Sequence, residues 1–472
     1  MLTTLTAPAF AETWYIENGD ITVKAGETGN DVTQNNETTY GDTGTVIKNY
    51  DKDTASSNTV TIEAKDKDDK VEVTLDNVNI KADSGSAITS KGDVTLTLKG
   101  DNSLTGGISD NGSYGLRGIS SNGSLTITGG ETDSLTAQGG SGTYDGGSGI
   151  YSNSLTISGG TVNATGGKSG AGIHSGSFTI YGGTVNAKGG NGGNVSGAGI
   201  ISDGGVTISG GTVKAAGGDS KDGYGGDGIR SGGVVTISGN TVNAAGGNGG
   251  KVGGYGICSF DRVAISGGTV EAAGGNGSTG GGSGIYSSVI DLSGSLELTA
   301  KAGSPNGKAL SRAGSELDLD TIKDKLGPGA KVTTTDADGK VKQVSGPRPV
   351  EPEKPVIPEE SSSSSDGGSA TQSAPASPLP GLTVTDKDGQ RISYTSTQSG
   401  NTLTVCVGRF TASLRASLAA LRQLRAEGID TITFQTILCS TTLSVDELLA
   451  MGGEDAEAVL THRLTASSLT VG

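Results

Sequence analysis

Side chains that could contact a ligand recur one position after a repeated isoleucine. In chain order these positions are Thr89, Ser120, Tyr151, His174, Ile201, Arg230, Cys258 and Tyr286. A tyrosine ring offers a flat apolar face to a sugar ring, and an arginine guanidinium can bind a uronate carboxylate through two hydrogen bonds. The residue types predict a carbohydrate-binding face with contacts from Tyr151, His174, Arg230 and Tyr286. An exposed face without a ligand is the alternative, because single exposed aromatic side chains are ordinary, and Ile201 and Cys258 in the same series favour it.

A second group of side chains could bind a cation. The loop 217–228 carries Asp219, Asp222 and Asp227 among glycines, and carboxylate and carbonyl oxygens are the ligands that calcium prefers. Their spacing is short and irregular, and aspartates in solvated turns fit it equally well. Calcium is therefore the one cofactor that the sequence predicts, with both interpretations open.

Enzymatic activity is a rival hypothesis. A glycosidase needs two carboxylates about 5–9.5 Å apart on one face, whereas the outward positions supply only isolated acids, Glu271 and Asp291. A calcium-assisted lyase could use Arg230 as its base beside the aspartate loop. No residue is assigned a catalytic role on this evidence.

The isoleucine belongs to a longer repeat. It recurs at intervals of 31, 31, 23, 27, 29, 28 and 28 residues, from Ile88 to Ile285. The clearest copies are residues 149–167, GIYSNSLTISGGTVNATGG, and 172–190, GIHSGSFTIYGGTVNAKGG. Apolar and polar residues alternate in both, which is typical of half-buried strands. The glycine pairs 159–160 and 166–167 predict sharp turns in which a positive φ is tolerated.

Each repeat therefore predicts three short strands and three corners. One repeat buries too few aliphatic side chains, at about 1.5–3 kcal/mol each, to offset the cost of ordering its backbone, about 1–2 kcal/mol per residue. The repeats must stack, with each strand paired in parallel to its counterparts about 4.8 Å away. The sequence predicts an all-β fold: a right-handed parallel β-helix of three strands per turn and about eight turns, followed by a linker and a small α+β domain. Residues after each isoleucine would point outward.

Six segments differ in composition. Residues 1–11 resemble the end of a secretory signal peptide, because Ala9-Phe10-Ala11 forms a small-x-small cleavage pattern. We assign residues 12–83 to an N-terminal cap and first coils, 84–303 to the β-helix repeats, and 304–345 to a C-terminal cap with a short helix at 315–327 and a hairpin at 331–344. Residues 346–381 are a Pro/Ser-rich linker.

The last segment, residues 382–472, is predicted to be the small α+β domain. Its pattern indicates the order strand, strand, helix, strand, helix, strand. One helix face is formed by Leu414, Leu418, Leu421 and Leu424, and Ser444 with Glu447 indicates a capping box before a second helix. Its role does not follow from the sequence.

Composition narrows the class of partner. The chain has 472 residues, 84 of them glycine, and a net charge of −16. An acidic surface repels phosphate backbones and anionic lipid, so nucleic acid is disfavoured as a partner, and no segment predicts a membrane span. The three cysteines, Cys258, Cys406 and Cys439, allow at most one disulfide bridge, between Cys406 and Cys439.

The segment 71–107, VEVTLDNVNIKADSGSAITSKGDVTLTLKGDNSLTGG, followed by repeated LTISGGTVNA units, resembles the carbohydrate-binding, pectate-lyase-like β-helix proteins of clostridial cell surfaces. The likeness covers about residues 60–303. It implies a secreted polysaccharide-binding module with affinity for cellulosic and acidic plant glycans and with bound calcium. One departure is that only Asp227-Gly228-Ile229 carries the Asp-Gly-Ile that such proteins often have at the head of a turn.

The function expected from these observations is non-catalytic binding of polysaccharide by a secreted or cell-surface β-helix. The alternatives are the calcium-assisted polysaccharide lyase and an adhesin, in which the repeats are a stalk and the C-terminal domain makes the contact. The oligomeric state does not follow from the sequence.

Overall fold

The computed structural model describes residues 11–64, 69–347 and, with short gaps, 381–471. The chain divides into two compact units, Met1–Pro352 and Glu353–Gly472. The predicted signal-peptide remnant, except for Ala11, and nearly all of the predicted linker lie outside the described residues. Among the described residues, no helix has the length and apolar character that a membrane crossing requires.

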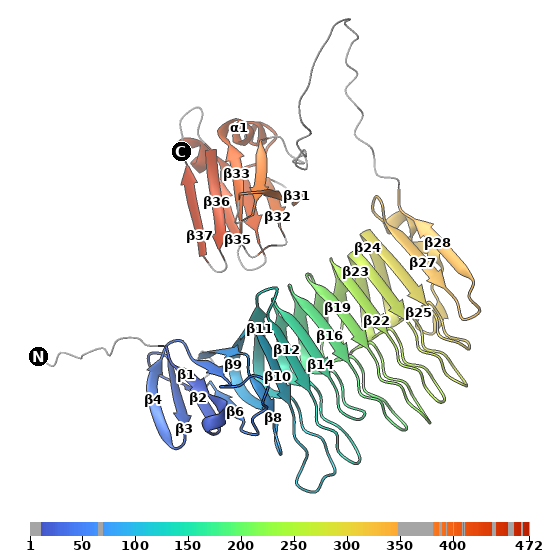
Figure 1. Cartoon of the computed structure of the whole chain (residues 1–472). Coiled ribbons are helices and arrows are strands. Elements are labelled where there is room, and N and C mark those ends of the chain that lie inside the picture. The colour runs from blue at the N-terminus through green and yellow to red at the C-terminus, as the bar shows by residue number, and fades with distance from the viewer. Residues whose placement is uncertain are drawn as a thin grey trace, which may run out of the picture. The chain divides into compact units, whose positions relative to one another are not determined.

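The first unit is a parallel β-helix, as predicted (Figure 1). Its first two sheets share the continuous strands β9 (Ile88–Lys99), β11 (Ile119–Gly129), β13 (Ile150–Ile157) and β15 (Ile173–Ile180), followed by the separate pairs β17 (Ile200–Ser202) with β18 (Val206–Ile208) and β20 (Ile229–Ser231) with β21 (Val235–Ile237). The third sheet contains β10 (Asp101–Thr105), β12 (Ser134–Gln138), β14 (Thr161–Thr165), β16 (Thr184–Lys188), β19 (Thr212–Ala216) and β22 (Thr241–Ala245). The strands β23 (Ile257–Ala273) and β24 (Ile285–Lys301) run through all three sheets.

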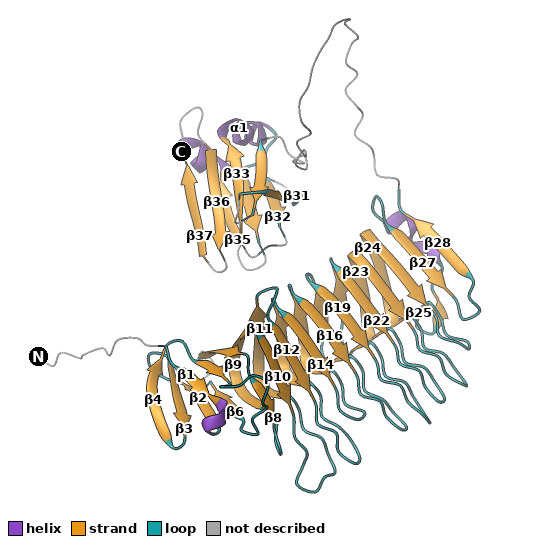
Figure 2. Cartoon of the chain, in the orientation of Figure 1, coloured by secondary structure: helices purple, strands orange, loops and turns teal. Residues whose placement is uncertain are grey.

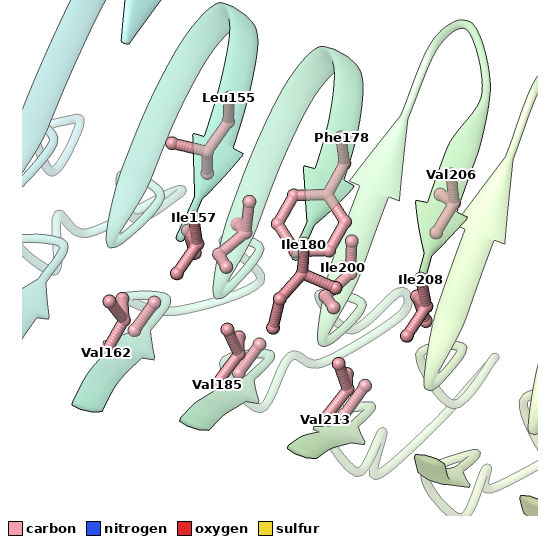
Figure 3. Packing of buried hydrophobic residues seen from close by; sticks show 14 of the residues in the cluster. Leu155, Ile157, Val162, Phe178, Ile180, Val185, Ile200, Val206, Ile208 and Val213 are labelled. Carbon is pink, nitrogen blue, oxygen red and sulfur yellow. The ribbon is translucent and has the colours of Figure 1, made fainter. Parts of the chain in front are cut away.

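Alternating side chains fill the interior of the rod. Leu155, Ile157 and Val162 are fully buried, and the residues in register with them on the next turn are Phe178, Ile180 and Val185. Figure 3 shows these side chains as columns that continue into Val206, Ile208 and Val213. Each column is one repeat position stacked on itself, so the period of the sequence directly sets the register of the core.

The rod has about twelve turns, so the predicted count of eight is too low. The first-sheet ladder begins before Ile88, with Ile21 paired to Val60 and Val60 paired to Ile88. It also continues beyond Ile285 to Leu310. These added positions carry the inward aliphatic side chain but lack the glycine that precedes most of the repeated isoleucines, so their turns were not counted.

Glycine serves two purposes in the turns. Gly160 has a φ of +74° at the corner before the third strand, as predicted. Gly167, after the third strand, does not have a positive φ, so that prediction is wrong there. A Cβ atom on Gly167 would overlap the carbonyl oxygen of Gly140 in the preceding turn. Glycine is needed at this position because neighbouring loops pack backbone against backbone.

The loops that follow the third strands lie side by side along one side of the rod, shown in teal in Figure 2. Backbone bonds connect them: Gly190 donates to the carbonyl oxygen of Gly170 at 2.8 Å, and Gly218 donates to that of Gly197 at 2.8 Å. Parallel bridges pair Val195 with Tyr224 and Tyr224 with Val252 near the loop tips. The loops are thus an ordered extension of the stack.

Antiparallel segments cover both ends of the stack. The first end contains β1 (Thr13–Tyr15), a 3₁₀ helix (Ile16–Asn18), β2 (Ile21–Ala25), β3 (Asn30–Gln34), β4 (Glu37–Asp42), β5 (Val46–Lys48), β6 (Val60–Glu63), β7 (Lys70–Asp76) and β8 (Asn79–Lys81). Of these, β3 and β4 form the antiparallel segment beside β2, whereas β1, β2, β5, β6, β7 and β8 pair in parallel as the first turns of the stack. The other end contains β25 (Leu310–Arg312), β26 (Ser315–Glu316), a 3₁₀ helix (Leu319–Lys325) and the hairpin of β27 (Lys331–Thr335) and β28 (Val341–Ser345). The predicted helix at 315–327 therefore starts later, because Asp318 accepts a bond from the Asp320 N–H and caps it.

The second unit is α+β, with two sheets ordered β30-β29-β33-β36-β37 and β31-β32-β34-β35. Its elements are β29 (Leu382–Thr385), β30 (Arg391–Ile392), β31 (Thr395–Ser399), β32 (Thr402–Cys406), β33 (Thr411–Ser417), α1 (Leu418–Ala426), β34 (Thr431–Gln435), β35 (Ser440–Ser444), α2 (Val445–Met451), β36 (Glu457–Arg463) and β37 (Ala466–Val471). Five strands precede α1 rather than the two predicted, and Leu414 lies in β33, because the Ser417 side chain caps the helix after it. Cys439 lies outside the described residues, so the possible bridge to Cys406 does too.

Candidate functional site

The residues that follow the repeated isoleucine form one in-register column on the first sheet. Tyr151 pairs with His174, His174 with Ile201, Ile201 with Arg230, Arg230 with Cys258, and Cys258 with Tyr286. We call this series, from Tyr151 to Tyr286, the first-sheet column. Its members are half-buried or exposed apart from Cys258.

Cys258 departs from the predicted outward exposure, being only 2% exposed. Burial raises the pKa of its thiol to about 12, and Asp227 and Arg230 are close enough to contribute opposing electrostatic effects. Cys258 is thus buried although it belongs to the outward series. A buried neutral thiol is a weak nucleophile, which argues against covalent chemistry at Cys258.

Tyr151 lies at the centre of a first group of side chains. The guanidinium carbon of Arg117 is 4.1 Å from its ring centroid. The His174 ring meets it edge-on, with centroids 5.3 Å apart and planes at 81°. His174 Nε2 is in turn 3.4 Å from Asp203 Oδ2. We call Arg117, Tyr151, His174 and Asp203 the Tyr151 cluster.

Tyr286 and Arg230 belong to a second group. The rings of Tyr255 and Tyr286 stack with centroids 4.9 Å apart and planes at 17°. The Arg230 guanidinium carbon lies 5.2 Å from the ring centroid of Phe260, which is 55% exposed. We call Asp227, Arg230, Tyr255, Phe260 and Tyr286 the Tyr286 cluster.

Asp227 is the buried acid of the Tyr286 cluster. Its Oδ1 accepts a 2.8 Å hydrogen bond from the Tyr255 N–H, and its Oδ2 is 3.9 Å from Arg230 Nη1. Burial raises the pKa of this carboxyl to about 6, and the hydrogen bond and the arginine lower it in part. A ligand that binds the Arg230 guanidinium would therefore share it with the Asp227 carboxyl group.

Three aromatic or cationic members of the two clusters were missed by the sequence analysis. Arg117 and Tyr255 each stand two positions before the repeated isoleucine, the position that Asp227 occupies in its own turn. A glycine separates this position from the isoleucine in all three turns, and the chain enters the first sheet there. The third, Phe260, lies at the corner after the first-sheet part of β23. Tabulating those positions for every turn would have found them.

The three aspartates predicted to bind calcium have separate environments. Asp219 Oδ1 accepts a 2.6 Å bond from the Asn248 N–H, and the Asp219 N–H donates to Asn191 Oδ1 at 2.9 Å. Asp222 is exposed, whereas Asp227 is buried beside Arg230. Within the described residues, no group of three or more histidine, cysteine, aspartate or glutamate side chains is placed to hold a metal ion. The aspartates thus do not form one ligand set, and no step below depends on calcium.

The two isolated acids considered for catalysis have protein partners. Glu271 Oε2 accepts a 2.7 Å bond from Asn243 Nδ2 on the third sheet. Asp291 Oδ2 lies 3.0 Å from Arg262 Nη1 on the second sheet. They lie on different sheets, so they do not constitute the facing carboxylate pair of a glycosidase.

One family model matches the rod. It is described as a beta helix repeat and covers three segments, residues 155–177, 178–200 and 206–229. Each segment runs from the second strand of one turn to the first strand of the next, so each spans about one turn of the stack. No curated protein and no solved structure matches the chain. The match and the strand register together make this chain a parallel β-helix protein.

Proposed function

We propose that this parallel β-helix is a secreted or cell-surface module that binds polysaccharide along its first sheet without cleaving it, with affinity for plant cell-wall glycans including acidic ones. The observation that carries the proposal is the first-sheet column, in which four of six consecutive turns place a ring or a cation in register, at Tyr151, His174, Arg230 and Tyr286. The resemblance of residues 60–303 to clostridial carbohydrate-binding β-helix proteins supports the same ligand class.

The geometry suits an extended polymer better than a small molecule. Neighbouring turns are about 4.8 Å apart, which is close to the length of one sugar unit, so successive sugars can meet successive turns. Four turns of the first-sheet column lie between the Tyr151 ring and the Tyr286 ring. A glycan that contacts both rings must therefore span several turns of the rod.

Acidic sugars are accommodated by the two arginines. Arg117 and Arg230 are exposed and lie against aromatic rings, so each can approach a uronate while its neighbour ring contacts the sugar. The outer face of the third sheet is less suitable, because Asn186 bonds Asn163 and Asn243 bonds Glu271 across neighbouring turns.

The lyase alternative is weakened by the environment of Arg230. A base that abstracts a proton must be neutral, whereas an arginine guanidinium keeps its positive charge in proteins, and Asp227 Oδ2 already lies 3.9 Å from Arg230 Nη1. The stalk alternative remains, since it requires only that the column has no ligand.

The experiment is retention of the full chain on cellulose and in polygalacturonate gels. We expect the double variant Tyr151→Ala/Tyr286→Ala to be retained at least about 5-fold less, because two aromatic contacts at about 0.5–1.5 kcal/mol each contribute about 1–3 kcal/mol together. Tyr40→Ala is the matched control, because Tyr40 is 71% exposed on β4, outside both clusters. Equal retention of all three proteins, or none of the native chain, would favour the stalk. A steady rise in absorbance from unsaturated products would indicate the lyase.

A further inference from the structure

An open depression of about 670 Å³ lies between the loops beside the Tyr151 cluster. The loop 139–149 forms one wall and the loop 189–199 the other, while the shorter loop 166–172 forms the floor. His174 and Ile201 of the first-sheet column line its inner side. We call this depression the notch.

The notch arises from a difference in sequence between adjacent turns. The floor loop is GG-KS-GAG (166–172) and the wall loop after it is GG-NGGNVS-GAG (189–199), so the two share both ends and differ only in the middle. The shared glycines pack alike: a Cβ on Gly166 or Gly189 would overlap the carbonyl oxygen of Gly170 or Gly197 in its own loop. The floor loop therefore has the same base as its neighbours and lacks their tip.

The missing tip interrupts the pairing of the loops. Tyr114 forms a parallel bridge with Asp145 on one side of the notch, and Val195 forms one with Tyr224 on the other. The two walls are two turns apart, or about 9.6 Å at about 4.8 Å per turn. The opening therefore admits an object about as thick as one strand.

The side chains around the notch differ in chemistry in a way that suits a sugar. Tyr144, 68% exposed, offers a ring face, Asp145 accepts hydrogen bonds, Lys168 donates them and Asn194 does both. The opposite charges of Asp145 and Lys168 favour a neutral ligand with adjacent hydroxyl groups. A pocket of this volume is within the range for small-molecule sites.

The floor is held in a fixed and costly conformation. Ser169 has a φ of +59°, which is uncommon for a residue other than glycine, and its hydroxyl donates to the Val195 carbonyl oxygen at 2.9 Å. Lys168 Nζ donates to the Thr143 carbonyl oxygen at 2.5 Å. The floor is thus tied to both walls, so the notch exists before any ligand binds.

We propose that the notch binds a single neutral sugar residue that projects from the polysaccharide as a branch or chain end, while the main chain follows the first-sheet column. This inference rests on the proposed function for the main chain, whereas the notch itself can be tested without a polymer. Tyr144 contacts the ring face, and Asp145, Lys168 and Asn194 contact its hydroxyl groups.

The decisive variant fills the notch. Replacing Lys168–Ser169 with the sequence of Asn191–Ser196 gives the floor loop the sequence of its neighbour and restores the missing tip. The matched control replaces residues 248–252, NGGKV, with the sequence of residues 276–280, NGSTG, which alters a loop tip that does not line the notch and keeps Tyr255 and every other member of the two clusters. Both full-length variants are first compared with the native chain by circular dichroism and thermal unfolding.

Saturation-transfer NMR then measures binding of the methyl glycosides of glucose, galactose, mannose, xylose, arabinose, rhamnose and N-acetylglucosamine. We expect at least one glycoside to receive saturation from the native chain and from the control, and not from the filled variant. Lys168→Ala and Asn194→Ala should each weaken that signal. Because these two substitutions change no loop length, they test the notch even if the filled variant does not fold.

The outcomes separate the notch from the main site. Saturation of no glycoside by the native chain, or equal saturation with the filled variant, would overturn the notch even if the rod is retained on cellulose or polygalacturonate. Loss of retention in the Tyr151→Ala/Tyr286→Ala variant with unchanged glycoside binding would support both sites. Glycoside binding without retention of the native chain on any polymer would leave the notch and remove the main-chain site.

Discussion

The guanidinium carbon of Arg117 lies 4.1 Å from the ring centroid of Tyr151, one turn further along the stack. The positive charge therefore covers one face of a ring that is proposed to stack on sugar. A contact of this kind at an exposed site contributes about 0.5–1 kcal/mol. The pair combines the two interactions that an acidic glycan needs, a cation and an apolar ring.

Substituting Arg117 should separate those two interactions. We expect Arg117→Gln to lower retention on polygalacturonate by about 2–5-fold at low salt, because an exposed charge pair contributes about 0.2–1 kcal/mol, and to have less effect at high salt. Retention on neutral cellulose should not fall, since the substitution uncovers the Tyr151 ring. Affinity electrophoresis at two salt concentrations measures both. An equal loss on both polymers would show that Arg117 acts by positioning Tyr151.

The fold followed from the sequence because one repeat position stacks on itself. Once Leu155 and Phe178 were assigned to the same position, the register of the second sheet was determined, and the structure pairs them. The outward column followed from the same alternation. The register and the outward column depend only on residues next to each other along a strand or one turn apart. The period of the repeat determines both relationships.

The rest depended on contacts that the period does not encode. The stack beyond Ile88 and Ile285 keeps only an inward aliphatic residue, as at Val60, so the signature was too weak to count. The ring of Tyr255, two positions before the isoleucine of its turn, stacks on the ring of Tyr286, one position after the isoleucine of the next turn. A period that aligns equal positions does not predict this contact. The short interval of 23 residues, from Ile150 to Ile173, is visible in the sequence. The notch, however, depends also on the longer loops on both sides, 139–149 and 189–199.

The buried acid Asp227 makes stability depend on pH. Its pKa is raised from 3.8 to about 6, chiefly by burial, so the folded chain holds this proton more tightly than the unfolded chain. The resulting stabilisation is fully present below about pH 4 and is lost as the pH rises through about 6, a change of about 3 kcal/mol for a shift of about two pKa units. Asp227→Asn remains neutral and can still accept the bond from the Tyr255 N–H.

We therefore expect Asp227→Asn to match the native chain near pH 4 and to unfold at a higher temperature above pH 6. Thermal unfolding at a series of pH values between 4 and 8 measures the difference. Asp222→Asn, at an exposed position of the same loop, serves as the control and should not change the pH dependence. A native melting temperature that rises between pH 4 and pH 6 relative to Asp227→Asn would contradict this assignment.

Asp219 belongs to a series of hydrogen bonds that connects successive loops, in which the other members named here are asparagines. Asp219 donates its N–H to Asn191, Asn248 donates its N–H to Asp219, and Asn276 donates its N–H to Asn248. An amide oxygen can accept the bond as a carboxylate does, so we expect Asp219→Asn to leave the melting temperature unchanged or higher. Asp219→Ala should lower stability by about 1 kcal/mol, because the Asn248 N–H loses its partner.

Measuring both variants with added calcium and with a chelator tests the predicted metal site as well. The role in these hydrogen bonds predicts the same order of stability in both conditions. A calcium-dependent rise in the native melting temperature that disappears in Asp219→Asn would instead assign Asp219 to a calcium site.

The glycines of the loops should differ sharply in their tolerance to a side chain. A Cβ atom on Gly190 would overlap the carbonyl oxygen of Gly167 in the neighbouring turn, whereas a Cβ on Gly193 in the same loop meets no atom within 4 Å. We expect Gly190→Ala to cost about 1–3 kcal/mol, because overpacked backbone must move apart. Gly193→Ala should be neutral or stabilising by about 0.4–1 kcal/mol, since it restricts only the unfolded chain.

Thermal unfolding and limited proteolysis of these two variants measure the effect. A stack is held by interfaces between adjacent turns, so a defect at one interface should divide the rod into two parts that unfold separately. Gly190→Ala should therefore broaden the transition and expose a cleavage site in the loops near residues 167 and 190, while Gly193→Ala keeps the native profile. Equal behaviour of the two variants would mean that the loops do not pack backbone against backbone, and the notch, whose floor and walls depend on that packing, would lose its structural basis.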